Sequence, residues 1–188
     1  MKTPNPFCLN KKSFKAFVLG ADPTNFSDNG NPKQLEYVFG ILSDEPRYFS
    51  GILKNLNLIG LHMEDIYVQN LIPVYLESET AKNKDWEVHA TIWIPKLIEE
   101  FDQVNPGRKK PVLVTAERIM KFLVNEDFIL PKAKDIYEES NTGLFVVKPK
   151  DNKLGRPLYA FYRHRAYDLF KNIYYRELLI LEQKNFLA

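Results

Sequence analysis

Short apolar runs alternate with helix-like stretches along the chain, and this alternation constrains the fold more than any other feature. The four β-like runs are residues 15–20, 65–73, 111–116 and 157–163. The first and third are almost continuously apolar, which is typical of strands that are buried on both faces of a parallel sheet. The alternation therefore predicts an α/β domain with helices on both faces of the sheet.

Helical spacing is clearest in two of the intervening stretches. In residues 45–60, the residues expected on one buried side are Phe49, Ile52, Leu53 and Leu56. In residues 86–102, the corresponding residues are Val88, Ile92, Leu97 and Phe101. This second stretch is expected to be helical although it contains Pro95. A last helix is expected over residues 166–183.

Residues 144–163 have the pattern of a β-hairpin. Two β-like arms, residues 144–148 and 157–163, flank a polar turn that contains Gly155. The second arm is expected to be the fourth parallel strand, and the first an antiparallel edge. A chain of 188 residues, 45% of them hydrophobic, is long enough for one core and too short for two ordinary domains. We therefore expect residues 1–188 to form a single three-layer α/β/α sandwich with a central, mainly parallel four-stranded sheet.

Composition and charge exclude several classes of function. The formal net charge is +2, so the charge balance does not by itself indicate a polyanionic partner. The sequence has one cysteine, Cys8, so we expect no disulfide, no zinc or iron–sulfur site and a reducing environment. It has no run of about 18 apolar residues and no secretory leader pattern, so we expect a cytoplasmic protein that makes no membrane contact. We also expect it to be a monomer.

Polar residues follow each of the four predicted strands. In open parallel sheets, ligands bind beyond the carboxyl ends of the strands. The residues that the strands deliver there are Gly20, Asp22, Pro23, Asn70, Thr115, Glu117, Arg163, His164 and Arg165. Four unlike polar sets are therefore expected to converge at one edge of the sheet.

Three of these side chains carry chemistry that an enzyme can use. Asp22 can activate water, Asn70 can present a donor and an acceptor to a planar ring, and His164 can stabilise a developing oxyanion. Each also has a structural alternative. Asp22 fits a turn or a helix cap, Asn70 a backbone-bonded amide, and His164 a solvated basic loop. None of the three decides the function alone.

Taken in order, these segments resemble the uracil-DNA glycosylase superfamily over most of the chain. That family has a buried strand ending in Gly-x-Asp-Pro, here LGADPTNF, and a second strand ending in Asn, here VQNLIPVY. Next come a helix start with Lys and Trp, AKNKDWEVHATIWIPKLIEEF, a strand leading into a helix, PVLVTAERIMKFL, and a His-containing loop, FYRHRAYDLF. The ordered set carries the resemblance, because the first motif alone is weak.

The resemblance implies a DNA glycosylase that flips uracil or a related damaged base out of DNA and hydrolyses its N-glycosidic bond without a cofactor. It implies that Asp22 positions the water and stabilises the cationic sugar, and that His164 hydrogen-bonds the departing base. Asn70 would then read the pyrimidine edge, and the flipped base would stack on Phe39. The other residues expected to line the base pocket are Gly20, Ala21, Pro23 and Thr24.

Contacts to DNA phosphates are expected near the mouth of this pocket. The candidates are Thr115 and Arg118 at the start of a helix, where backbone N–H groups favour anions, and Arg163 and Arg165 in the basic loop. Each of these residues also fits an ordinary surface role.

The sequence departs from the family at two places. Thr24 stands where the best known branch has a Tyr that excludes thymine, so exclusion of thymine does not carry over. His164 is followed by Arg-Ala-Tyr instead of Pro-Ser and a wedge loop, so duplex opening does not carry over either. Two alternatives stay open: a protein of the same fold that binds nucleic acid or a nucleotide without cleaving it, and a generic α/β domain with a small-molecule site.

Overall fold

A five-stranded, mostly parallel sheet forms the centre of the protein. The computed structural model describes residues 2–24, 33–43, 47–138 and 143–186. The strands are β1 (Ala16–Gly20), β2 (Ile66–Asn70), β3 (Val112–Val114), β4 (Val146–Val147) and β5 (Leu158–Ala160). Their order across the sheet is β2-β1-β3-β5-β4. The mixed α/β class and the parallel pairing of the four predicted strands are confirmed.

The sheet has one strand more than the four predicted for it. Strand β4 pairs antiparallel with β5, in the register Val146 with Tyr159 and Val147 with Leu158. This is the first arm of the predicted hairpin, so the hairpin itself is confirmed. The arm adds a fifth strand to the sheet because its backbone completes the open edge of β5.

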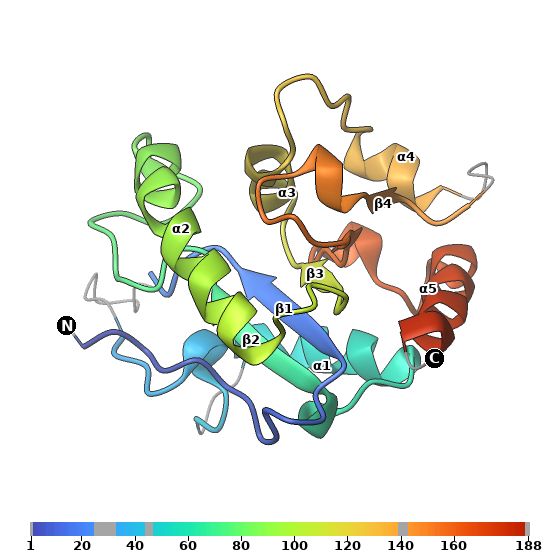
Figure 1. Ribbon diagram of the computed structural model, residues 1–188, viewed down its shortest axis with the longest axis horizontal. Helices are drawn as coiled ribbons and strands as arrows, with labels where there is room; N and C mark the ends of the chain where they lie inside the picture. Colours follow the sequence, from blue (N-terminus) through green and yellow to red (C-terminus); the bar gives the residue numbers. More distant parts are fainter. Residues whose placement is uncertain (1, 25–32, 44–46, 139–142, 187–188) are drawn as a thin grey trace.

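Among the described residues, five α-helices lie around the sheet (Figure 1). They are α1 (Arg47–Leu58), α2 (Trp86–Val104), α3 (Glu117–Leu123), α4 (Ala133–Tyr137) and α5 (Ile173–Phe186). Short 3₁₀ helices lie at Val38–Gly40, Met63–Asp65, Pro149–Asp151 and Arg165–Tyr167. Among the described residues, no helix is long and apolar enough to cross a membrane.

Side-chain contacts attach helices to both faces of the sheet. On one face, Phe101 of α2 stacks on Phe17 of β1, with ring centroids 3.9 Å apart. On the other face, Tyr159 of β5 donates a hydrogen bond to Glu182 of α5. Figure 1 shows α2 crossing in front of β1 and β2, with α1 behind them. The sheet is therefore covered on both sides, which explains why all residues of β1 and β2 are buried.

The predicted buried face of α2 is wrong in its first half. Val88 and Ile92 are 62% and 59% exposed. At about 100° per residue, Val88 lies about 180° around the helix from Leu97, so the two cannot share a buried face. The residues that α2 buries are Trp86, Ala90, Leu97 and Phe101. The helix continues through Pro95, as expected.

The last helix begins later than predicted, at Ile173 instead of Ala166. Asp168 Oδ1 accepts a hydrogen bond from the Phe170 N–H at 2.9 Å, and Asn172 Nδ2 donates to the Asp168 carbonyl at 2.7 Å. Such local side-chain bonds offer the backbone an alternative to the helix. Residues 168–172 therefore form a turn, and α5 starts after it.

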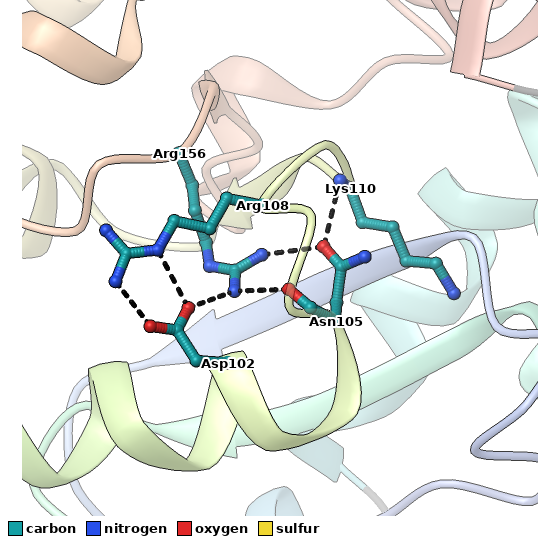
Figure 2. A network of polar contacts seen from close by, with 5 residues as sticks. All are labelled: Asp102, Asn105, Arg108, Lys110 and Arg156. Atoms are coloured by element: carbon teal, nitrogen blue, oxygen red, sulfur yellow. Dashed lines mark hydrogen bonds and ion pairs between the residues drawn. The ribbon is translucent and has the colours of Figure 1, made fainter.

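A polar network fastens α2 to the edge of the sheet where the strands begin (Figure 2). Arg156 is 1% exposed and lies two residues before β5. Its Nη2 donates to Asp102 Oδ1 at 2.7 Å and its Nη1 to Asn105 Oδ1 at 2.7 Å. Arg108 also donates a hydrogen bond to Asp102. This hydrogen bond, and to a smaller extent the one from Arg156, lowers the pKa of the Asp102 carboxyl below its ordinary value. This edge is opposite the carboxyl ends of the strands, so we assign the network to stability.

Asp102→Ala is expected to destabilise the fold by about 3 kcal/mol at pH 7, because it leaves the buried Arg156 charge unpaired. A lowered pKa means that the carboxylate stabilises the folded state above its unfolded pKa of about 4, and that this stabilisation fades as the pH falls below it. Urea denaturation of both proteins at pH 7 and pH 3 measures the difference. The exposed Asp127→Ala is the control, with an expected effect within about 0.5 kcal/mol. An equal loss at both pH values would contradict a charge-based role.

Candidate functional site

Strands β1 and β2 deliver their last residues side by side. Gly20 pairs with Asn70 in the parallel register. Beyond the strands, the Gly20 carbonyl accepts from the Leu71 N–H at 2.8 Å, and the Ala21 carbonyl from the Ile72 N–H at 2.9 Å. The two chain segments therefore leave the sheet together, so residues 20–24 and 70–76 form one wall at the carboxyl edge.

Gly20, Asn70 and Phe39 meet at this edge. A Cβ atom on Gly20 would lie 2.7 Å from Phe39 Cε2, and closer still to Asn70 Oδ1 and Phe39 Cζ. Only glycine fits without displacing those two side chains. Phe39 has φ 59°, in the left-handed region that costs a non-glycine residue about 1–3 kcal/mol. The aromatic ring is thus held against Gly20 and Asn70 by a backbone conformation that is unfavourable by itself.

Asn70 carries an unused hydrogen-bond donor. The side chain is 2% exposed, and its Nδ2 atom has no hydrogen-bond partner among the described residues. Its backbone N–H donates to Gln69 Oε1 at 2.8 Å, and Gln69 Nε2 is itself held by Glu100 Oε1 at 2.9 Å. Leaving a buried amide donor unpaired costs about 1–3 kcal/mol. The carboxyl edge therefore contains a buried amide whose Nδ2 donor has no partner among the described residues.

Asp22 lies in a cradle of three donors. Its Oδ1 accepts from the Thr24 N–H at 3.0 Å. Its Oδ2 accepts from Thr80 Oγ1 at 2.5 Å and from Trp86 Nε1 at 3.0 Å. A carboxylate has about four acceptor positions. The cradle therefore fixes the orientation of Asp22 and leaves acceptor capacity for one more donor, such as a water molecule.

The other predicted pocket residues lie around this cradle. Thr24 Oγ1 accepts from the Leu76 N–H at 2.8 Å, so its hydroxyl joins the two segments that follow the strands. Pro23 is buried, and Ala21 is half-buried against the core. These residues line the wall beside Asp22.

The predicted phosphate-binding residues have different surroundings. The Thr115 hydroxyl is buried and donates to the Leu19 carbonyl at 2.9 Å. Arg118 donates to the carbonyls of Thr80 and of Asn83, the latter at 3.0 Å. Arg163 is exposed, and its N–H donates to the Thr115 carbonyl at 3.0 Å. The backbone of Arg165 begins a 3₁₀ helix, and its side chain lies outside what the structure describes.

His164 is exposed at the end of the segment after β5. Its Nδ1 accepts from the Ala166 N–H at 3.2 Å, and its ring lies 5.6 Å from that of Tyr167. A neutral imidazole that accepts at Nδ1 carries its proton on Nε2. The Nε2–H is thus the donor that His164 offers to a ligand, but the hydrogen bonds and ring contacts of His164 join it to its own loop and not to Asp22, Asn70 or Phe39.

No family model matches the sequence, and no curated protein matches it. The interpretation of the site therefore rests on its own chemistry. Among the described residues, no group of three or more His, Cys, Asp and Glu side chains is arranged to hold a metal ion.

Sequence reasoning missed three residues of this edge. Two of them hold Asp22: Thr80 lies before α2, and Trp86 is its first residue. They follow Asp22 by 58 and 64 residues, and no periodic pattern in the sequence connects positions so far apart. Tyr162, two residues after β5, is the third: it is 2% exposed and its hydroxyl has no partner among the described residues. Burial, with Glu117 and Tyr167 nearby, raises the pKa of Tyr162, so its hydroxyl stays protonated. Its place in an apolar run made it look like an ordinary strand residue.

Gly20→Ala is expected to lower any catalytic activity of this site by roughly 100-fold, because the new methyl group must displace Asn70 Oδ1 and the Phe39 ring. The cost to stability should be about 1–3 kcal/mol, as for other overpacked positions. Gly51→Ala in α1 is the matched control, since nothing lies within 4 Å of a Cβ there. Steady-state kinetics and thermal unfolding of both variants measure the two effects. Full activity in Gly20→Ala would contradict a functional role for this contact.

Proposed function

We propose that this protein is a DNA glycosylase, a divergent member of the uracil-DNA glycosylase superfamily, which hydrolyses the N-glycosidic bond of uracil or a related damaged base. The observation that carries the proposal is the buried Asn70 amide, whose Nδ2 has no partner among the described residues, beside Gly20 and Phe39. Helices on both faces of a mostly parallel sheet also agree with the three-layer α/β/α sandwich of that superfamily.

Asn70 is suited to reading a pyrimidine edge. An amide offers a donor and an acceptor side by side, which complements the adjacent carbonyl and N–H groups of uracil. Since the Asn70 side chain is 2% exposed and its Oδ1 lies against Gly20, the amide has little freedom to turn toward another partner. The free energy lost by the unpaired Nδ2 is recovered when a base binds, because the base carbonyl accepts its hydrogen bond.

Phe39 supplies a surface for the flipped base. Extruding a base from duplex DNA costs a few kcal/mol, and stacking on an aromatic ring returns about 1–3 kcal/mol. The Phe39 ring and Asn70 Oδ1 both lie close to the Cβ position of Gly20, so a base stacked on the ring would lie within reach of the amide. Stacking and hydrogen bonding therefore act on the same base.

Asp22 acts on the sugar side of the bond. As the N-glycosidic bond breaks, its electron pair leaves with the base and the sugar becomes cationic at C1′. Water then adds to C1′, and its proton goes to the Asp22 carboxylate. The negative charge of Asp22 stabilises the cationic sugar mainly in the transition state, so it lowers the barrier more than it strengthens binding.

His164 is proposed to donate its Nε2–H to the departing base as negative charge grows on the base carbonyl. The neutral tautomer fixed by the Ala166 N–H supports this role. Because His164 is exposed, its donor would reach the base only when DNA covers the loop.

A protein that binds nucleic acid or a nucleotide without cleaving it is the second candidate. The exposure of His164 favours it, as do the contacts of His164, which lie within its own loop. In that case the Asn70 pocket would bind a base and leave the glycosidic bond intact.

Treatment of an oligonucleotide containing one uracil with the protein, followed by alkali, tests the proposal. We expect strand cleavage at the uracil position. Binding without cleavage, on single and double strands and with other deaminated bases, would support the second candidate. A protein that neither binds nor cleaves any of these oligonucleotides would contradict both candidate functions.

A further inference from the structure

Arg118 lies behind the Asp22 cradle. It is half-buried on α3, one residue after the helix begins. It donates from Nη1 to the Thr80 carbonyl and from Nη2 to the Asn83 carbonyl, the second bond at 3.0 Å. Its guanidinium also lies over the Trp86 ring, 4.9 Å from the centroid. One side chain thus holds the segment 80–86 at three points.

The same segment supplies two of the three donors to Asp22. Thr80 and Trp86 donate to the same atom, Asp22 Oδ2. Arg118 therefore contacts both of these residues, Thr80 through its carbonyl and Trp86 through its ring. The Asp85 N–H donates a hydrogen bond to Asn83 Oδ1 at 2.9 Å, but this bond lies within the segment and does not connect it to α3.

We propose that Arg118 is a positioning residue for Asp22, acting through Thr80 and Trp86, and that it is not a contact to DNA phosphate. The consequence for catalysis rests on the proposed function, whereas the positioning itself does not. Two of the guanidinium donors and one face of its plane are already engaged within the protein. Removing Arg118 should loosen the cradle without removing an interaction with DNA.

The Trp86 indole N–H gives a readout that needs no activity. The chain has two tryptophans, so Trp93→Phe leaves Trp86 as the only source of an indole Nε1–H signal in a proton–nitrogen NMR spectrum. We expect Arg118→Met in this background to shift that signal and speed its exchange with solvent. Asp22→Asn should shift the same signal, because it changes the acceptor. Lys121→Met, an exposed position on α3, should leave it in place. An unchanged signal in Arg118→Met would overturn the proposal.

Kinetics separate positioning from phosphate binding. We expect Arg118→Met to lower the single-turnover excision rate at saturating protein by roughly 100-fold, the scale of a misplaced catalytic group. The dissociation constant for DNA and its salt dependence should not change. A phosphate contact predicts the opposite: an unchanged saturated rate, with a slope of log Kd against log salt smaller by about one. That result would overturn the proposal.

A conservative variant covers the case in which Arg118→Met does not fold. Arg118→Lys keeps the charge but cannot bond both carbonyls and stack on Trp86 in the same geometry. It should change the indole signal and the rate in the same direction by a smaller amount, and wild-type values for both would overturn the proposal. If the wild-type protein excises no base, the proposed function fails and the indole signal alone decides whether Arg118 positions Asp22.

Discussion

Asp22→Asn is expected to lower the rate of base excision by roughly 1,000-fold, within the range for a group that acts on a proton or a charge in the transition state. Asparagine has nearly the same size, and its oxygen can still accept from Thr80 or Trp86. The substitution removes the negative charge and the ability to take the proton of water. Single-turnover excision from a uracil-containing oligonucleotide measures the rate.

The control for this prediction is Asp85→Asn. Asp85 is an exposed aspartate next to Trp86, so its replacement makes the same chemical change outside the cradle. We expect Asp85→Asn to retain the wild-type rate and both variants to show wild-type circular dichroism. An Asp22→Asn protein as active as the wild type would mean that Asp22 is only a turn former.

Asn70→Leu is expected to abolish excision while making the protein more stable. Leucine has the same branched shape and the same number of side-chain heavy atoms, and it removes the buried Nδ2 that lacks a partner among the described residues, so the free energy of unfolding should rise by about 1 kcal/mol. Without the amide, the pocket loses its contact to the base edge, and the excision rate should fall by roughly 1,000-fold or more. Opposite changes in stability and activity are typical of a residue kept for function.

Asn152→Leu provides the contrast. Asn152 is also buried, but its Nδ2 donates to the carbonyls of Lys148 and Arg156, and its Oδ1 accepts from the Leu154 N–H. Its replacement should destabilise the fold and leave the saturated excision rate unchanged. Urea denaturation and single-turnover kinetics of the two variants measure both quantities. Destabilisation in Asn70→Leu with normal activity would assign Asn70 to structure.

The strand pattern predicted the part of the fold that brings the site residues to one edge. Apolar runs fix which segments form the sheet, and the parallel register then puts Gly20 beside Asn70. The buried face of α2 was harder to predict, because Val88 and Ile92 are as apolar as the residues that pack on the sheet. Their exposure depends on how the helix is rotated, which tertiary contacts of Trp86 and Phe101 decide.

The donors of the Asp22 cradle lie beyond what sequence spacing can reveal. Thr80 belongs to the segment between β2 and α2, and its contact with Asp22 depends on how that segment crosses the end of β1. Arg118 was predicted from charge and helix position alone. Its contacts to Thr80, Asn83 and Trp86 depend on α3 packing beside that segment.

The most direct test of the account is the NMR signal of the Asn70 side-chain amide in a DNA complex. Asn70→Leu identifies the signal by its loss. The Asp22→Asn protein is then bound to an oligonucleotide with one uracil, and to the same oligonucleotide with an abasic analogue at that position. We predict that the Asn70 amide signals differ between the two complexes, because only uracil offers the amide a partner, while those of Asn152 stay the same. Identical Asn70 signals in both complexes would contradict the central claim that this amide reads a flipped base.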